Sequence, residues 1–403
     1  MNSYLGAALK SPAAFVERHH DELTAIRRDL HAHPEIGFEE HRTAALVAER
    51  LHQWGIEVHT GIGRTGVVGV IRGRKDGSGR AIGLRADMDA LPIREENDFA
   101  HRSTNQCYMH ACGHDGHTTM LLGAAQYLSA TRSFDGTVYL IFQPGEEGYA
   151  GARAMIDDGL FTRFPADEVY GQHNWPGLPA GHIGLNPGPM MAAADRVEIT
   201  ITGRGGHGAH PHLTIDPVLI AAHLITAAQS IVARNVAPLE AAVVSLCAVS
   251  SGNLDAFSVV PREAKISGTV RAFQHSVQEQ IEGRLRELAE SVAAGFGGRA
   301  KVDYQRMYPA TINHRPNYEF AATVAEELVG RERVVRNLPP SMGAEDFAFM
   351  LQAKPGCYAR LGQGGGEGRW LHSTRYDFND AVIPLGAGFL AALAERRMPL
   401  PTS

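Results

Sequence analysis

The chain has 403 residues, 44% of them hydrophobic, which is ordinary for a globular protein and long enough for two domains. Its formal net charge is −6, and no basic run indicates a nucleic acid or an anionic membrane surface as a partner. No stretch approaches the roughly 20 apolar residues that span a bilayer. Residues 1–15 lack the regions of a signal peptide, and the cysteines are too sparse for a disulfide scaffold. We expect a cytoplasmic enzyme or binding protein.

Short apolar runs alternate with helical patterns through the first half of the chain. Runs that are β-branched, apolar and bounded by glycine or polar residues predict strands at residues 65–71, 81–86, 136–143 and, more weakly, 169–174. Helical patterns occupy residues 12–31, 39–55 and 117–130. Near-continuous apolar strands separated by helices predict an α/β layer around a buried, mainly parallel sheet.

A different pattern follows the Pro/Gly-rich stretch at residues 184–191, which suits a linker. It reads strand, helix, strand, strand, helix, strand, at residues 196–202, 216–235, 241–249, 264–273, 276–296 and 301–307. This order is the ferredoxin-like split motif. The α/β character returns from about Pro309. We therefore predict a discontinuous α/β domain of residues 1–189 and 307–403, with an α+β ferredoxin-like domain of residues 190–306 inserted in it.

Residue types that bind metals lie in five segments, of which three follow predicted strands, while "CGHDGH" comes before a predicted helix and opens it. They lie in "RADMDALP", "MHACGHDGH", "QPGEEG", "QHNWPG" and "WLHSTRYDF", and the candidates in them are Asp87, Asp89, Cys112, His114, Glu146, Glu147, His173 and His372. Ligands of α/β sheets collect beyond the carboxyl ends of the strands. We expect these segments to converge on one sheet edge, with His372 joining from the start of the C-terminal helical region.

Cys112 and His114 have the spacing Cys-x-His, and no second cysteine pair follows to close a structural zinc site. In an extended turn, alternate residues point the same way, so both side chains would reach one metal ion. One thiolate with imidazoles and a carboxylate suits Zn²⁺ or Mn²⁺ better than Ca²⁺ or Mg²⁺. The pattern favours a metal site of the catalytic kind.

Glu146 and Glu147 are adjacent carboxylates that repel each other and point differently. One can ligate a cation while the other faces a water whose pKa the cation lowers to about 7. Paired glutamates are common on surfaces, as at Glu39 and Glu40, but Glu146 and Glu147 follow a Pro-Gly turn directly after an apolar strand. This pair indicates metal-assisted hydrolysis.

The remaining polar residues have two interpretations each. Asp89 orients a ligating histidine or caps a loop, and His110 and His117 are ligands or neighbours of ligands. "GRGGHGAHPH" (203–212) offers histidine donors around flexible glycines, or is only a polar loop. Arg271 binds a substrate carboxylate or forms a surface salt bridge.

Seven segments together carry a family resemblance: "DLHAHPEIGFEE", "LRADMDALPI", "HACGHDGHTTMLLGAA", "FQPGEEG", "GGHGAHPH", "GTVRAF" and "GAEDFAFM". In this order, from about residue 20 to the C-terminus, the chain resembles the metal-dependent aminoacylase/carboxypeptidase (zinc peptidase) family. It is most similar to the amidohydrolase subgroup, which contains hippurate hydrolases, N-acyl-amino-acid amidohydrolases and auxin-conjugate hydrolases. The resemblance implies a zinc-peptidase-like α/β catalytic domain with an inserted lid, and a homodimer or higher homo-oligomer formed through that lid.

The resemblance also implies roles for individual residues. Two divalent ions per subunit, Mn²⁺ or Zn²⁺, are expected on Cys112, which bridges them, and on His114, Glu147, His173 and His372. Glu146 matches the general base. His207 matches the lid histidine that polarises the scissile carbonyl, and Arg271 the residue that holds the substrate's α-carboxylate. Ser258 stands where the family usually has asparagine, and Asp87 stands where other branches have a histidine ligand.

The expected reaction is hydrolysis of an N-acyl or N-aroyl amino acid to a carboxylic acid and a free amino acid. The small-molecule substrate is the expected partner, with no nucleic acid and no membrane. Two other hydrolase activities remain open: a dipeptidase or carboxypeptidase, and a deacetylase of an N-acetyl diaminopimelate-type intermediate. A metal- or peptide-binding relative without catalysis is the third alternative. The Glu146–Glu147 pair argues against it, because a pure binder needs no free base beside a ligand.

Overall fold

The computed structural model describes residues 12–365 and 369–401 and divides into two compact units. Unit 1 comprises Met1–Met190, Ile312–Pro339 and Asp346–Ser403, and unit 2 comprises Met191–Thr311 and Pro340–Glu345. The boundaries drawn from the sequence lie close to the breaks at residues 190 and 311, whereas residues 340–345 group with unit 2. Most of the stretch inspected for a signal peptide, residues 1–11, lies outside the described residues.

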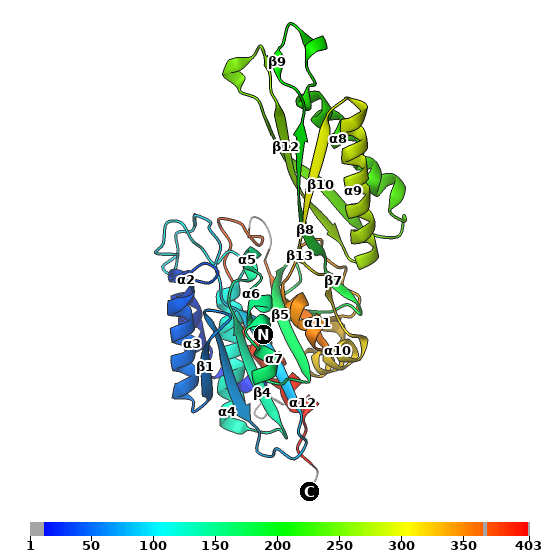
Figure 1. The fold of residues 1–403 in the computed structure, drawn as a ribbon. Coiled ribbons are helices and arrows are strands. Elements are labelled where there is room, and N and C mark those ends of the chain that lie inside the picture. The colour runs from blue at the N-terminus through cyan, green and yellow to red at the C-terminus, as the bar shows by residue number, and fades with distance from the viewer. Residues whose placement is uncertain (1–11, 366–368, 402–403) are drawn as a thin grey trace. The chain divides into compact units, whose positions relative to one another are not determined.

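Unit 1 is built on an eight-stranded sheet in the order β1-β2-β4-β3-β5-β16-β6-β15 (Figure 1). The strands are β1 (Glu57–Ile62), β2 (Gly66–Arg72), β3 (Ala81–Asp87), β4 (Thr137–Gln143), β5 (Glu168–Pro176), β6 (Ile183–Gly184), β15 (Val334–Val335) and β16 (Gly356–Gly364). All four strands predicted in the first half are present. Residues 183–184 and 189–191 (β7) are short strands within the stretch expected to be a linker.

The sheet is mixed, which corrects the expectation of a mainly parallel sheet in detail. The centre is parallel, since β3 pairs in parallel with β4 and β5, and β5 with β16. β2 is antiparallel to both β1 and β4, and β16 is antiparallel to β6. A short connection joins β1 to β2, and only an antiparallel pair can be closed by so few residues.

Helices cover both faces of this sheet. Gly171 and Gln172 are consecutive in β5 and therefore face opposite sides. A Cβ on Gly171 would meet Phe347 of α11 (Phe347–Ala353), whereas the Gln172 amide donates to the carbonyl of Gly386 in α12 (Ile383–Arg397). The other helices of the unit are α1 (Pro12–Glu17), α2 (His20–Ala32), α3 (His41–Gln53), α4 (His114–Thr131), α5 (Glu146–Tyr149), α6 (Gly151–Asp157), α7 (Leu160–Arg163) and α10 (Arg315–Val329).

Unit 2 has a four-stranded antiparallel sheet in the order β10-β12-β8-β13 (Figure 1). Its elements are β8 (Ala193–Thr202), α8 (Pro217–Ser230), β10 (Ala242–Ser251), β12 (Glu263–Ala272), α9 (His275–Gly295) and β13 (Arg299–Tyr308), with short strands β9 (Gly206–His207), β11 (Val259–Val260) and β14 (Thr311–Ile312). This is the predicted ferredoxin-like order. Buried residues recur every four positions along α9 at Ile281, Leu285, Ala289 and Ala293, so one stripe of the helix faces the sheet.

Within the described part of the chain, one helical stretch, Pro217–Asn235, is long and apolar enough to cross a membrane by length and composition alone. The sequence pattern predicted a helix at residues 216–235 but no stretch that could span a bilayer. Its α8 part packs against α9 and β12 inside unit 2, and Ile220 and Leu224 belong to that unit's hydrophobic core. A core helix of an α+β domain has the same composition.

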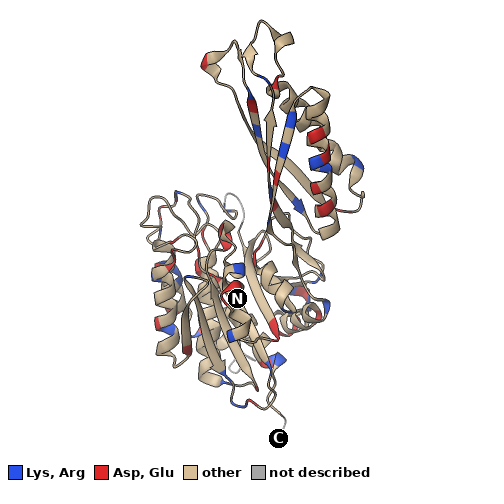
Figure 2. Ribbon diagram, viewed as in Figure 1, with Lys and Arg blue, Asp and Glu red and all other residues tan. Residues whose placement is uncertain are grey.

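Acidic and basic residues are interspersed along the elements of each unit (Figure 2). α9 carries charges of both signs, and Arg286 donates to Glu282 at 2.9 Å, one helical turn away. Arg306 of β13 binds the other oxygen of the Glu282 carboxylate at 2.9 Å. The charges of this helix are therefore largely engaged in local pairs.

Candidate active site

Three neighbouring strands bring metal-binding residue types to one edge of the unit 1 sheet. β3 ends at Asp87, which stands opposite Gln143, the last residue of β4. Glu146 follows β4 by three residues, at the start of α5. His173 lies inside β5, within the strand predicted at residues 169–174. Since β3, β4 and β5 run in parallel, these segments share one edge.

The loop between Cys112 and His114 is not the extended turn that the spacing suggested. Gly113 has φ +92°, in the left-handed region, and α4 begins at His114. The backbone at Gly113 passes so close to Asn174 and Tyr376 that a Cβ there would lie 2.3 and 2.5 Å from their oxygens. Glycine therefore permits the turn that brings the Cys112 and His114 side chains together.

Among the described residues, five sets of three donor atoms lie within 4.8 Å of one another. Three of them overlap: Cys112, His114 and His173; Cys112, Glu147 and His372; and His114, Glu146 and Glu147. The other two sets are Asp87, His114 and His117, and Glu146, Glu345 and Asp346. Cys112 is shared by the first two of the overlapping sets. Thiolate, imidazole and carboxylate donors fit Zn²⁺ or Mn²⁺.

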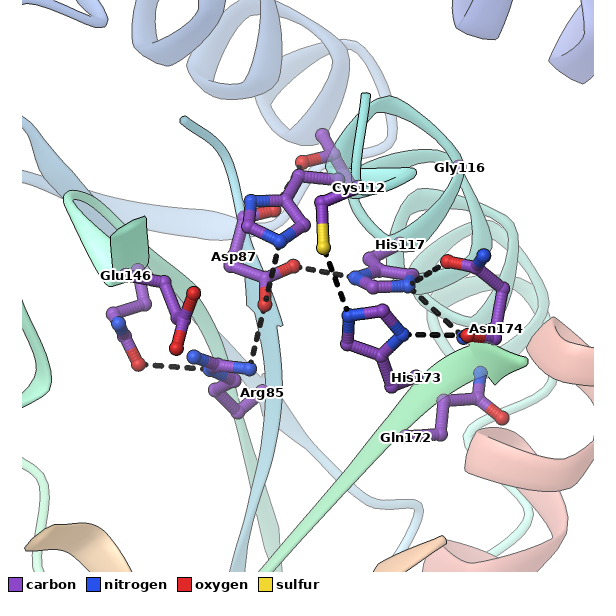
Figure 3. Close-up of polar contacts among 12 residues, drawn as sticks. Arg85, Asp87, Cys112, Gly116, His117, Glu146, Gln172, His173 and Asn174 are labelled. Atoms are coloured by element: carbon purple, nitrogen blue, oxygen red, sulfur yellow. Dashed lines mark hydrogen bonds and ion pairs between the residues drawn. The ribbon is translucent and has the colours of Figure 1, made fainter. Parts of the chain in front are cut away.

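His173 presents an unprotonated nitrogen to Cys112 (Figure 3). Its Nδ1 lies 2.6 Å from the backbone oxygen of Asn174, which can only accept, so Nδ1 carries the hydrogen and Nε2 a lone pair. Nε2 lies 3.3 Å from the Cys112 sulfur. Burial, with His117 nearby, holds the pKa of His173 well below its usual value. Burial, with the Glu147 and Glu146 carboxylates, raises the pKa of the Cys112 thiol.

His114 is held by Asp89, as the sequence suggested. The His114 Nδ1 lies 3.2 Å from Oδ1 of Asp89, and its buried Nε2 has no hydrogen-bond partner among the described residues. Burial alone would lower the pKa of His114, but the carboxylates of Asp87 and Asp89 outweigh it and raise that pKa to about 10. This Nε2 lies 3.6 Å from Oδ2 of Asp87. A buried imidazole nitrogen without a hydrogen bond, with carboxylates nearby, is a fitting place for a cation.

The two glutamates of "QPGEEG" are held separately. The Glu147 backbone N–H donates to Oδ2 of Asp89 at 2.9 Å, and Oε1 of Glu147 lies 3.2 Å from Nε2 of His372. His372 comes from the loop before α12; it has φ +63°, and its side chain is 53% exposed. Oε1 of Glu146 accepts the backbone N–H of Asp346 at 3.2 Å. The Glu147 carboxylate thus lies beside the His372 imidazole, whereas the Glu146 carboxylate lies beside the backbone N–H of Asp346.

The flanking residues hold the donors in place. Both ring nitrogens of His117 are engaged, Nδ1 at 2.6 Å from Asp87 and Nε2 at 2.6 Å from Asn174 (Figure 3). Asp87 also accepts a hydrogen bond from Arg85 at 2.8 Å. Both ring nitrogens of His110 are buried without a partner among the described residues, and it belongs to none of the five donor sets.

Several residues of this site had no role in the sequence analysis: Arg85, Gln143, Asn174, Asp346 and Tyr376, all buried. A signal for one of them was present. Arg85 and Asp87 are charged residues in an otherwise apolar buried strand, and such charges need buried partners. Asp346, which binds Arg85, and Tyr376, which binds Asn174, lie far from these partners in sequence, so nothing local identifies them.

The predicted substrate residues lie in unit 2. His207 of β9 pairs with Val259 of β11, and the carbonyl of Ser258 accepts the Gly208 N–H at 2.7 Å, so His207 and Ser258 are neighbours. Nδ1 of the exposed His207 accepts the Ala209 N–H at 3.1 Å, which leaves the hydrogen on Nε2.

Arg271 stands in β12 of the same unit and is half-buried. Burial lowers the pKa of Arg271, with Asp195 nearby acting in the opposite direction. Among the described residues, no carboxylate lies within ion-pair distance of its guanidinium.

Comparisons with known proteins agree with this arrangement. The sequence pattern of peptidase family M20/M25/M40 matches residues 83–396. The chain is 43% identical over 373 residues to the hippurate hydrolase of Campylobacter jejuni subsp. jejuni, covering 93% of this chain and 96% of that protein. It is 38% identical over 377 residues to the N-acetylcysteine deacetylase of Bacillus subtilis, with the same two coverages.

The fold is also that of solved structures. The Bacillus subtilis YXEP protein, described as a dinuclear metal-binding peptidase of the M20 family, matches 95% of this chain and 99% of its own with a TM-score of 0.82 and 34% identity. The predictions of the family, the fold class and an amide-hydrolysing enzyme are confirmed. The chain belongs to peptidase family M20/M25/M40.

Proposed function

We propose that this protein is a metal-dependent amidohydrolase that cleaves N-acyl or N-aroyl amino acids, such as hippurate, to a carboxylic acid and a free amino acid. The observation that carries the proposal is the position of Glu146. Its buried carboxylate belongs to the donor set with His114 and Glu147, yet it is absent from both sets that contain Cys112. A carboxylate that lies beside a candidate cation site, but belongs to neither of the sets that contain Cys112, is suited to act as a base.

Two divalent ions, Mn²⁺ or Zn²⁺, would be held by the two sets that share Cys112, one with His114 and His173 and the other with Glu147 and His372. When bound, such ions polarise a carbonyl and make a water molecule acidic near neutral pH. Asp89 keeps the hydrogen of His114 on Nδ1, and the Asn174 carbonyl does the same for His173, so each Nε2 would offer a lone pair as a ligand.

Glu146 takes the proton of the attacking water as the new C–O bond forms at the substrate carbonyl. It then gives that proton to the amide nitrogen as the C–N bond breaks, so that the amino acid leaves as a neutral amine. Both transfers need a carboxylate that is free to change protonation state. The backbone N–H of Asp346 donates to Oε1 of Glu146 at 3.2 Å and so helps to hold this carboxylate in place.

For three residues of unit 2 we propose the roles that the family resemblance implies. His207, with its hydrogen on Nε2, donates to the oxyanion that forms on the former carbonyl oxygen. Arg271 binds the α-carboxylate of the substrate bidentately. Ser258, beside His207, has a shorter side chain than the asparagine usual in the family and tunes the space around the acyl group. We further propose that residues 190–306 act as the lid and form a homodimer or higher homo-oligomer, and that the enzyme is cytoplasmic.

The test is release of glycine from hippurate by the purified protein, before chelation, after chelation and after addition of Mn²⁺ or Zn²⁺. We expect activity that disappears with the chelator and returns with one of the ions. If the protein released no glycine from hippurate before chelation or after metal addition, although two ions were bound per chain, the proposed acyl specificity would be wrong.

A deacetylase activity is the second candidate, favoured by the 38% identity to an N-acetylcysteine deacetylase. A panel of N-benzoyl, N-acetyl, diaminopimelate-type and dipeptide substrates separates these activities by kcat/KM. The highest kcat/KM on N-acetyl substrates would select the deacetylase, and the highest on dipeptides a peptidase.

A further inference from the structure

Asp346 is a fully buried carboxylate immediately before α11. It accepts three hydrogen bonds: from the Arg85 guanidinium at 3.1 Å, from the Gln143 amide at 2.8 Å and from the Ala152 backbone N–H at 2.9 Å. A buried carboxylate with one cation and two neutral donors is electrostatically satisfied, and its position is fixed from three directions.

Two of those donors stand on either side of the base. Gln143 is the last residue of β4 and Ala152 belongs to α6, so the segment between them carries Glu146. The Asp346 carboxylate therefore ties together both ends of this segment. Its own backbone N–H donates to Oε1 of Glu146 at 3.2 Å. Asp346 thus contacts the segment before, at and after Glu146.

Arg85 connects this anchor to the metal-binding side of the site (Figure 3). Its Nε donates to Gln143 at 2.8 Å and its Nη1 to Asp87 at 2.8 Å, while Nη2 reaches Asp346. Asp87 in turn lies 2.6 Å from His117. One buried guanidinium therefore holds two carboxylates at a fixed separation, one on the side of the base and one on the side of the imidazoles.

We propose that Asp346 is a positioning residue for Glu146, acting through the segment 143–152, with Arg85 as its counter-charge. This inference rests on the proposed function, since it needs Glu146 as the base. Displacement of a reacting group by about 1 Å can cost 100-fold in rate, so loss of the Asp346 carboxylate should lower kcat without removing the metal ligands. Asp346 also belongs to a set of carboxylates with Glu146 and Glu345 whose oxygens lie within 4.8 Å of one another, so the metal content of its variants must be measured beside kcat.

The test is a double-mutant cycle of Asp346→Asn with Glu146→Gln. In Asp346→Asn the side-chain NH₂ group cannot accept a hydrogen bond, so at least one of the donors Arg85, Gln143 and Ala152 loses its acceptor and the segment 143–152 is held less firmly. We expect kcat on the best substrate to fall about 10- to 100-fold, with KM changed little. In the Glu146→Gln background, assayed at high enzyme concentration, the same substitution should change the residual rate less than about twofold, because the base is already absent.

Two further measurements separate positioning from general damage. Bound metal, measured by mass spectrometry of the purified variants, should equal that of the wild type. The matched control is Asp135→Asn: Asp135 is also buried and accepts a backbone N–H, from Ser78 at 3.1 Å, but it precedes β4 at the opposite end of that strand. The control should lower the thermal midpoint and leave kcat unchanged.

Where Asp346→Asn does not fold, Asp346→Glu takes its place in the cycle, because Arg85 then keeps a carboxylate while the added methylene shifts the anchor. Equal losses in both backgrounds, a raised KM with unchanged kcat, lost metal, or an unchanged kcat would each overturn the inference. The proposed function fails separately, when the wild type hydrolyses no N-acyl amino acid or when Glu146→Gln retains full activity.

Discussion

Gly113 and Asn174 are in such close contact that a Cβ on the glycine would lie 2.3 Å from the Asn174 side-chain oxygen. The contact joins the loop before α4 to the end of β5, and so fixes the distance between the two segments that carry His114 and His173. A position this tight, in a left-handed conformation, excludes any other residue.

Gly113→Ala should therefore destabilise the fold by roughly 2–4 kcal/mol, the combined cost of overpacking and of a positive φ with a side chain. Denaturant unfolding measures it. Gly181→Ala is the control, since Gly181 has φ +84° and nothing within 4 Å of an added Cβ; it should lose only about 1 kcal/mol. Equal losses at both positions would show that the close contact with Asn174 carries no energy.

Glu146→Gln should fold, keep its metal content and lose about 10²–10⁴ in kcat, because the amide cannot accept the proton. Hydrolysis assays and metal analysis of the same preparation measure the two effects. Glu39→Gln, in the exposed member of the other glutamate pair, should behave as the wild type. A Glu146→Gln enzyme of near-normal rate would remove this residue from the mechanism.

Cys112→Ser should lower the affinity for divalent ions, because a serine hydroxyl does not replace a bridging thiolate at neutral pH. Cys112→Asp should keep more metal, since a carboxylate can bridge. Titration of the metal-free variants with Zn²⁺ or Mn²⁺ gives both affinities. Cys247→Ser changes an exposed cysteine of unit 2 and should leave the affinity unchanged. Unaltered affinity in Cys112→Ser would exclude the sulfur as a ligand.

Stability should fall with rising pH because of His31. Burial lowers its pKa, but hydrogen bonds to Asp115 and Glu95 outweigh this and raise the pKa to about 9. The folded state thus holds the proton more tightly than the unfolded chain, whose pKa is about 6.5. The contribution is complete below about pH 6.5 and is lost as pH rises through about 9, an effect of roughly 1–3 kcal/mol.

Chemical unfolding of wild type and His31→Gln between pH 6 and pH 9.5 measures this effect. The wild type should lose stability across that window, and the variant should be less stable at pH 6 with a flatter profile. His33→Gln, at a half-exposed position two residues after the last buried residue of α2, is the control and should keep the wild-type slope. Parallel profiles for wild type and His31→Gln would contradict the assignment.

The strands and the ferredoxin-like order were predictable because their patterns are local. β3 and β4 are mainly apolar runs, β5 has a weaker apolar start, and β8 alternates between buried and partly exposed residues. β1 (Glu57–Ile62) was missed, since most of its residues are exposed or half-buried and carry no alternation. Its pairing with β2 decides its conformation, and pairing is a tertiary property.

The candidate site shows the same division. Cys112, His114, Glu146, Glu147 and His173 stand in short motifs beside predicted strands, so their convergence followed from topology. The Asp346 anchor did not, because its meaning lies in a contact with Arg85, 261 positions away in the chain. The left-handed conformation of Gly113 was likewise not predictable, because it depends on the close contact with Asn174, a residue distant in sequence.

The strand order of the unit 1 sheet differs from the order in which the strands are synthesised. β16 lies between β5 and β6, yet it is made after the whole of unit 2, and His372 is made later still. At 5–20 residues per second, roughly 10–40 s separate His173 from His372 during synthesis. For that interval the nascent chain presents a thiol, two imidazoles and a carboxylate without the last donor, and with β5 unpaired on one side. The complete donor set can therefore form only after His372 has been made.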